Sequence, residues 1–428
     1  MRKLNIAIIG LGNIGSYLYK YLNDNKRILT EKNNCQPVVK YVSAKNKKRK
    51  RNIIIKKNQW LKNYLDSTKI KEVDLIIELI GGSEGAAKKL VFNALKNKKH
   101  VVTANKALIA KYGDQLSKIA EKNKVNLEFE ASVCGGVPII RSLKEGLIAN
   151  KISKIYGIFN GTSNYILSNM DKQNKNFNEV LQDAKHFGYA ESNPASDLNG
   201  DDVSSKLKIL SSLCFNTFLS KDIYVEGIKD IDKADIDNAN KLGYKIKLLG
   251  FAESINNKFY QRVHPTLIKK NSYVASIDGV LNAVIVDGKP VGQSIIQGEG
   301  AGPAATTSAL VSDISSILRG NVKFPFSLSN KERKKIKFEN IENREFSAYL
   351  RFEVIDKPGV LSNITNVISK NKVSIKRLLQ NPNKNKKTST IIIVTHKSKD
   401  KFLKRILTVI NKKNYIKKKP KLIRINDN

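Results

Sequence analysis

The sequence predicts an α/β protein in which a doubly wound parallel sheet is followed by a mixed α+β domain and a small βαββαβ domain. Three observations support this prediction. Short apolar strands alternate with helical runs over residues 1–130, and a glycine-rich turn follows the first strand. Strand and helix patterns then recur in the order βαββαβ over residues 346–428. At 428 residues the chain has room for about three domains.

Composition narrows the class of protein. The hydrophobic content of 41% is that of a water-soluble globular chain, and no run approaches the roughly 20 apolar residues of a membrane span. The N-terminus resembles a signal peptide only briefly, because it lacks a small-residue cleavage site and leads directly into glycines. Three scattered cysteines form neither a metal-binding spacing nor a disulfide framework. We therefore expect a cytoplasmic protein without a membrane partner.

The net charge of +39 raises the question of a nucleic-acid partner. The positive charge is spread along the chain, and only Lys45–Arg51 and the region Lys417–Lys421 are dense. Neither run interleaves aromatic residues, as a single-strand platform would. We expect solvated basic faces and no nucleic-acid partner.

A glycine-rich turn lies between the first strand, Leu4–Ile9, and a helix that extends through Leu22. The first glycine permits the tight turn, the second lets the backbone approach a pyrophosphate, and the third allows close helix–strand packing. The helix N-terminus then faces the phosphates. This context favours dinucleotide binding over a plain βα turn. The predicted cofactor-binding residues are Gly10, Leu11, Gly12, Asn13, Ile14 and Gly15.

The second strand, Pro37–Val42, indicates which nucleotide binds. It ends at Lys45 and a basic run, and no acid stands there to hold a ribose 2′-hydroxyl. Lys45 and its neighbours suit a 2′-phosphate, which favours NADPH, with NADH as the alternative. A mobile surface loop is the other interpretation of the run, and the two are compatible.

The remaining elements of the first domain complete a doubly wound sheet. Lys106 lies just beyond the carboxyl end of a strand, where such sheets bind ligands, although a lysine there is by itself more often a surface residue. The predicted strands are Val73–Ile80, His100–Thr103 and Asn126–Phe129, and the predicted helices are Ala86–Lys96 and Gln115–Lys122.

Glu130 opens the segment EASVCGGVPII, in which two glycines precede Pro138. Their turn could direct carbonyl oxygens inward beside the carboxylate, and a hard monovalent cation would suit such oxygens. An interdomain hinge is the alternative. The sequence of the rest of the second domain predicts a mixed sheet with several helices, one of which follows the segment Asn160–Asn164. The predicted elements are Ile152–Phe159, Lys233–Leu242, Lys247–Phe251, Gln261–Leu267, a hairpin over Ala283–Gln297 with its turn at Asp287-Gly288, and Ala304–Leu318.

The acid-rich stretch Gly188–Leu207 is the strongest candidate for chemistry. Asp202 and Lys206 are four residues apart at the start of an apolar-periodic helix, so they share one face. A lysine held by a carboxylate is a suitable proton donor. An ordinary surface ion pair is the alternative for this spacing taken alone.

The sequence resembles the homoserine dehydrogenase family over about residues 1–325. The motifs that carry the resemblance are GLGNIG, TANKALIA, EASVCGGVPII, NGTSNYIL, GYAES followed by GDDVSSK, and GEGAGPAATTSALVSDI. The resemblance implies a Rossmann-type NAD(P)-binding domain (1–130) and a catalytic and dimerisation domain (131–325). It also implies reduction of aspartate 4-semialdehyde to homoserine by a homodimer or homotetramer. No kinase domain precedes the first strand, so the monofunctional form is expected.

The resemblance assigns roles to individual residues. Lys206 is implied as proton donor, Asp202 as its orienting carboxylate, and Lys106 as a second lysine between cofactor and substrate. The implied substrate-binding residues are Glu191 and Asp197; the further cofactor-binding residues are Thr103, Lys106 and Gly302; and the implied Na⁺ or K⁺ ligands are Glu130, Val133, Gly135 and Val137. Cys134 departs from the family's glycine, and a positive φ there would strain the turn by roughly 1–2 kcal/mol. Catalytic groups at this spacing argue against a nucleotide sensor without chemistry.

The C-terminal domain, 346–428, resembles a ferredoxin-like ACT regulatory domain and follows a charged linker, 326–345. The resemblance rests on the segment DKPGVL within the order βαββαβ. It implies feedback regulation by an amino-acid effector: threonine is expected to bind at Asp356, Gly359 and Leu361 and to lower activity. A dimerisation module without a ligand is the alternative.

Overall fold

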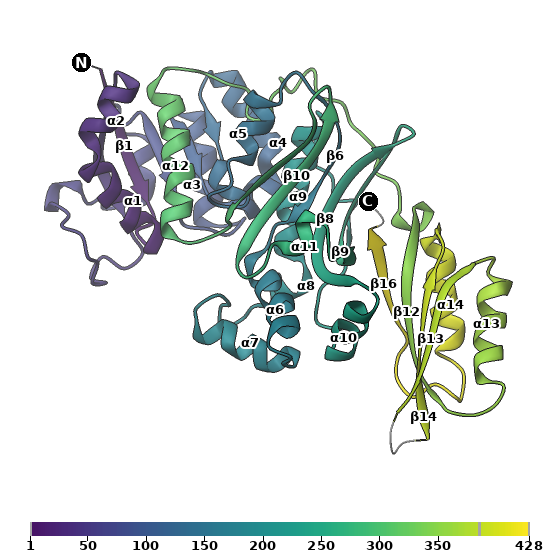
Figure 1. Cartoon of the computed structure of the whole chain (residues 1–428). Coiled ribbons are helices and arrows are strands. Elements are labelled where there is room, and N and C mark those ends of the chain that lie inside the picture. Colours follow the sequence, from purple (N-terminus) through teal and green to yellow (C-terminus); the bar gives the residue numbers. More distant parts are fainter. Residues whose placement is uncertain (1, 384–386, 427–428) are drawn as a thin grey trace.

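The computed structural model describes residues 2–383 and 387–426 (Figure 1). Its first unit is a five-stranded parallel sheet in the order β2-β1-β3-β4-β5. The strands are β1 (Lys3–Ile9), β2 (Gln36–Ser43), β3 (Leu75–Glu78), β4 (His100–Thr103) and β5 (Leu127–Glu128). The helices are α1 (Asn13–Asp24), α2 (Lys26–Asn33), α3 (Ala86–Lys96) and α4 (Lys106–Asn123), with short turns η1 (Lys57–Gln59), η2 (Tyr64–Thr68) and η3 (Glu130–Ser132).

Alternation along β1 explains why helices cover both faces of this sheet. Ala7 and Ile9 pack with the apolar residues of α3 and α4, whereas Ile6 and Ile8 pack with those of α1 and α12 (Pro303–Leu318). Helix α12 therefore returns from the second domain to the first, beside α1 (Figure 1). The predicted doubly wound sheet is confirmed. Helix α4 begins at Lys106, earlier than the predicted Gln115.

The second domain is built on a mixed sheet that continues into the C-terminal domain. One sheet has the order β11-β10-β6-β8-β9-β16-β12-β14-β13, with β7 beside β9 and β15 beside β12. Its strands here are β6 (Lys151–Ile158), β7 (Tyr224–Val225), β8 (Tyr244–Ile255), β9 (Lys258–Lys269), β10 (Leu281–Lys289) and β11 (Gly292–Glu299). The other helices are α5 (Ile139–Arg141), η4 (Ser142–Gly146), α6 (Gly161–Lys172), α7 (Phe177–His186), α8 (Ala195–Asn199), α9 (Asp201–Cys214), α10 (Lys233–Lys241) and α11 (Tyr273–Ser276).

The hairpin of β10 and β11 was predicted correctly, but the position of its turn was wrong. Asp287 and Gly288 lie within β10, and Gly288 pairs with Gly292. The turn falls at Pro290 and Val291, and Gly292 has the positive φ of 79°. The strand pairing therefore continues past the Asp-Gly step.

The C-terminal domain has the predicted βαββαβ order. Its elements are β12 (Glu345–Ile355), α13 (Val360–Lys370), β13 (Ile375–Pro382), β14 (Thr388–Thr395), β15 (Ser398–Lys399), α14 (Asp400–Ile410) and β16 (Lys421–Asn426), preceded by the turn η5 (Ile341–Asn343). Strand β16 pairs in parallel with β9, so the two domains share hydrogen bonds as well as side-chain contacts.

The charged segment predicted as a linker is packed against the domains. Phe326, Arg333 and Phe338 are each less than 5% exposed. No helix among the described residues is long and apolar enough to cross a membrane.

Candidate active site

Three predicted residues meet at the N-terminal ends of two helices. Asp202, in the first turn of α9, is 4% exposed and lies between two lysines. Lys206, one turn further along α9, contacts Asp202 Oδ2 at 2.8 Å. Lys106, the first residue of α4, contacts Oδ1 at 2.8 Å. The cofactor-side lysine and the α9 pair therefore form one cluster.

The charges of this cluster stabilise one another. Burial acts to raise the pKa of Asp202, but the ammonium groups of Lys206 and Lys106 hold that pKa well below its usual range. Burial acts to lower the pKa of Lys206, and the Asp202 carboxylate raises it instead. Lys206 Nζ also donates to the Phe159 carbonyl at 2.6 Å. Since an ammonium has three donors, one remains for a further acceptor.

Asn160 is a site residue that the sequence did not single out. Its Nδ2 donates to Asp197 Oδ1 at 2.8 Å and to Asp202 Oδ2 at 2.9 Å, while its Oδ1 caps α6 by accepting the Ser163 N–H at 2.8 Å. Burial raises the pKa of Asp197, against the hydrogen bond from Asn160. Asparagine directly before a helix is a common N-cap and was the available signal. Glu191 lies on the exposed loop before α8, where its placement relative to a substrate stays a prediction.

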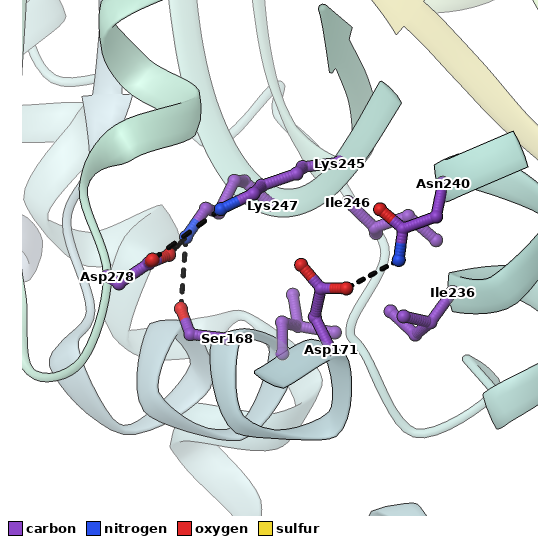
Figure 2. A pocket seen from close by; sticks show the side chains of 9 residues that line it. Ser168, Asp171, Ile236, Asn240, Lys245, Ile246, Lys247 and Asp278 are labelled. Atoms are coloured by element: carbon purple, nitrogen blue, oxygen red, sulfur yellow. Dashed lines mark hydrogen bonds and ion pairs between the residues drawn. The ribbon is translucent and has the colours of Figure 1, made fainter. Parts of the chain in front are cut away.

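Lys247 of β8 contacts α6, the helix that follows Asn160 (Figure 2). Its Nζ, on a side chain 1% exposed, donates to Asn164 Oδ1 at 2.9 Å and Ser168 Oγ at 3.0 Å, both on α6. The Ile277 carbonyl at 2.6 Å and Asp278 Oδ1 at 2.8 Å are also within hydrogen-bond distance, so four acceptors share the three N–H groups of this ammonium. Burial lowers the pKa of Lys247 to about 8, although Asp278 opposes this.

The glycine-rich turn opens onto a cleft of about 960 Å³ at the carboxyl ends of the strands. Gly10 has φ of 113°, and a Cβ there would lie 2.4 Å from the Leu79 carbonyl oxygen. A Cβ on Gly15 would lie 2.0 Å from the Gly10 carbonyl oxygen, so the helix packs closely on the strand. A Cβ on Gly12 would meet no described atom within 4 Å. Since Gly12 is the N-cap residue directly before α1, the glycine turn and the helix N-terminus fit a pyrophosphate.

The basic run folds over this turn. Arg51 Nε donates to the Leu11 carbonyl at 3.0 Å, and Arg49 lies 3.4 Å from Asn13 Oδ1. Lys45 lines the cleft and is exposed, so its ammonium is available to an anion at the rim. The run therefore belongs to the nucleotide cleft and is held by contacts of its own.

Two further predicted cofactor residues occupy different positions. The Thr103 hydroxyl is buried and donates to Glu78 Oε2 at 2.6 Å, so it faces a carboxylate at the end of β3. Glu78 Oε1 accepts the N–H groups of Ile80 and Gly81 at 2.8 and 3.0 Å, which fixes the loop beside the cleft. Gly302 is the N-cap residue before α12, with φ of 103°.

The predicted cation loop presents a buried carboxylate. Glu130 is 2% exposed, and burial raises its pKa to about 7, against the backbone N–H groups of Arg141 and Ile140 that it accepts. The neighbouring cations pair elsewhere, Arg141 with Asp313 at 3.4 Å and Lys144 with Glu128 at 3.1 Å. Both oxygens of this carboxylate accept backbone N–H groups, so a cation at this loop stays a prediction.

The backbone of this loop is left-handed. Cys134 has φ of 56° and Gly135 has φ of 46°, so the positive φ that the sequence raised for Cys134 is present. The Val137 carbonyl accepts the Ile139 N–H at 2.8 Å. The described residues contain no group of three or more His, Cys, Asp or Glu side chains that could hold a metal ion. Any cation here would therefore depend on one carboxylate and on backbone oxygens such as that of Val133.

The predicted effector residues surround the start of α13. Gly359 is the N-cap residue before the helix, with φ of 83°, and Asp356 accepts a hydrogen bond from Gln380 Nε2 at 3.4 Å. Leu361 is partly buried in the first turn. The arrangement offers backbone N–H groups and a carboxylate on one loop.

Comparison with known proteins identifies the family. Residues 138–315 match the family model for homoserine dehydrogenase, residues 10–130 its NAD-binding domain, and residues 342–401 an ACT domain. The homoserine dehydrogenase of Neisseria gonorrhoeae is 37% identical, and the alignment covers 99% of both chains. That of Bacillus subtilis is 36% identical over 96% of this chain and 95% of its own.

Solved structures agree with these matches. The crystal structure of a homoserine dehydrogenase from Thiobacillus denitrificans has a TM-score of 0.93 at 35% identity, covering 100% of this chain and 99% of the other. That of S. aureus at pH 7.5 has a TM-score of 0.76 at 33% identity, with 100% of each chain covered. With its NAD-binding domain, its mixed catalytic sheet and its ACT domain, the chain belongs to the homoserine dehydrogenase family of oxidoreductases.

Proposed function

We propose that the enzyme catalyses the reversible NAD(P)H-dependent reduction of L-aspartate 4-semialdehyde to L-homoserine, a step towards threonine and methionine, in the cytoplasm. A single observation carries this proposal. Each carboxylate oxygen of Asp202 forms an ion pair with a lysine, Oδ1 with Lys106 of the cofactor domain and Oδ2 with Lys206 of the catalytic domain. Each lysine places a positive charge between the cofactor and substrate domains.

The cluster suits reduction of a carbonyl group. A bound nicotinamide supplies the hydride. Lys206, charged and with a donor to spare, stabilises negative charge on the substrate oxygen and delivers a proton to it. Asp202 orients Lys206 and keeps it charged. In the oxidative direction the same lysine must accept the proton, so homoserine oxidation should rise with pH.

The other groups place the substrate and cofactor. Lys106 lies between the substrate and the cofactor. Asp197 and Glu191 bind the substrate's amino group. The turn Gly10–Gly15 holds the pyrophosphate, and Lys45 holds a 2′-phosphate, so NADPH is preferred to NADH. Thr103 and Gly302 support the nicotinamide side of the cleft.

A monovalent cation, Na⁺ or K⁺, and an amino-acid effector complete the proposal. Glu130 with the carbonyl oxygens of Val133, Gly135 and Val137 would hold the cation, whose charge compensates the buried carboxylate.

Threonine would place its carboxylate on the N–H groups after Gly359 and its amino group on Asp356, beside Leu361, in a homodimer or homotetramer. The support for an effector is the ACT domain match and this loop.

The decisive experiment replaces Lys206 by methionine. We expect kcat for aspartate semialdehyde to fall at least ~10²-fold, because a general acid and a charge stabiliser are both lost. NADPH affinity, measured by fluorescence titration, should change little. Lys208→Met on the same helix is the matched control. A Lys206→Met enzyme that keeps most of its kcat would remove this lysine from the mechanism.

A further inference from the structure

The segment between α12 and β12 crosses the junction of the cofactor and catalytic domains. Phe326 packs on Gly113 of α4, where an added Cβ would lie 2.9 Å from its ring. Asn330 Nδ2 donates to Ser117 Oγ at 3.0 Å and to Glu121 Oε1 at 2.6 Å, also on α4. The segment therefore lies along α4 at several points.

Arg333 is the buried centre of this segment, at 4% exposure. Its Nη2 contacts Asp114 Oδ1 of α4 at 2.7 Å and Ser212 Oγ of α9 at 2.9 Å. The Thr217 carbonyl accepts from Nη2 at 2.7 Å and from Nε at 3.2 Å. The guanidinium carbon also lies 4.3 Å from the centroid of the Phe326 ring. One planar group thus joins two helices in a fixed orientation.

These two helices carry the catalytic cluster. Helix α4 begins at Lys106, and α9 supplies Asp202 and Lys206. The helices pack against each other and are tied at two levels, by Lys106 on Asp202 and by Arg333. At 1.5 Å per residue, the Arg333 contacts lie about 12 Å from Lys106 along α4 and about 15 Å from Asp202 along α9.

The ion pair between Lys106 and Asp202, at the N-terminal ends of α4 and α9, does little by itself to fix the distance between the two helices. The Lys106 side chain is 42% exposed, and a flexible exposed lysine contributes little to fixing the distance between two domains. Catalysis is sensitive to that distance, because a misplacement of 1 Å can cost roughly 10²-fold. The buried guanidinium has the rigidity that the lysine lacks.

We propose that Arg333 is a positioning residue that sets the spacing of α4 and α9 and thereby holds Lys106 on Asp202. This inference rests on the proposed function of the Lys106–Asp202–Lys206 cluster. It gives the interdomain segment a role in the reaction, in addition to connecting the ACT domain.

The test is a double-mutant cycle on the full-length enzyme, with aspartate semialdehyde and NADPH. Arg333→Met should lower kcat about 10-fold, change the KM for NADPH less than about twofold, and leave the fold intact by circular dichroism. Lys331→Met, an exposed cation of the same segment, is the control and should match the parent. In a Lys106→Met background, adding Arg333→Met should change kcat less than about twofold, because the group it positions is gone.

Two outcomes would overturn the inference. One is a folded Arg333→Met enzyme with parental kcat, and the other is the same 10-fold loss in the Lys106→Met background. If Arg333→Met does not fold, Asp114→Asn and Ser212→Ala remove one contact each and are judged by the same criteria. Turnover by the parent enzyme reports on the proposed function, whereas this inference depends only on ratios between variants.

Discussion

Asn160 offers the sharpest test of how the site is held together. Asn160→Ala removes the N-cap of α6, which contributes about 1 kcal/mol, and two hydrogen bonds to charged carboxylates. Bonds of that kind contribute about 1.5–3 kcal/mol each when buried. Asp202 keeps both lysines and Asp197 is only partly buried, so we take the lower end for each bond and expect a loss of about 4 kcal/mol of unfolding free energy in all, cap included.

The same change should reach the chemistry. Without the amide, Asp202 loses one of three orienting contacts, and kcat should fall about 10-fold. The hydrogen bond from Asn160 lowers the pKa of Asp197, which burial already raises. Removing it raises that pKa further, so the acid limb of kcat/KM should move to higher pH.

Asn160→Ser separates the two roles, because serine caps a helix well but its single hydroxyl replaces only one of the two carboxylate contacts. Urea unfolding should show about 1 kcal/mol recovered relative to Asn160→Ala, while kcat should stay low. Recovery of kcat by Asn160→Ser, or parental kcat in Asn160→Ala, would show that the amide bridge has no part in catalysis.

Four further predictions follow from the other sites. Lys45→Glu should raise the KM for NADPH about 10-fold and leave that for NADH nearly unchanged, since only one of them carries a 2′-phosphate; equal effects would refute that site. Replacing Na⁺ and K⁺ by tetramethylammonium should lower activity several-fold if Glu130 and its loop hold a cation, and unchanged rates would contradict this. Asp356→Asn should weaken threonine inhibition with unchanged kcat, as followed by calorimetry and kinetics; an enzyme that binds no threonine at millimolar levels would leave the ACT domain an assembly module. Finally, the folded pKa of Lys247, about 8, lies below its usual 10.5, so the unfolded chain binds more protons between these values and stability should rise with pH in that window. The parent should gain up to about 3 kcal/mol over Lys247→Met there, and parallel pH profiles would contradict the assignment.

What the sequence predicted well was local. Asp202 and Lys206 share a helix face because they are four residues apart. The glycine-rich turn could be predicted because its three glycines lie within six consecutive residues and act in the same turn. What it missed depends on distant partners. The contacts of Arg333 are 219 residues away at Asp114 and 121 away at Ser212, so no local pattern distinguishes it from neighbouring charged residues.

The hairpin shows the same limit. Asp-Gly is a favoured turn, yet the pairing of β10 with β6 and β11 carries the strand through it to Lys289. Tertiary pairing outweighed the local preference for a turn.

The parallel pairing of β16 with β9 has a consequence for how the ACT domain can be studied and how it can act. If the chain were cut before β12, β9 would keep β8 and β7 but lose β16 along residues 266–268, because β16 is the last described strand. Such a cut would leave a bare sheet edge, prone to join another molecule. It would also leave Asp235 and Glu226 without Arg351 and Arg424. A shortened enzyme would therefore aggregate for reasons unrelated to inhibition. Conversely, a ligand that tilts the ACT domain must also displace β9, because β16 pairs with it. Since β9 pairs with β8, that displacement would reach the catalytic sheet.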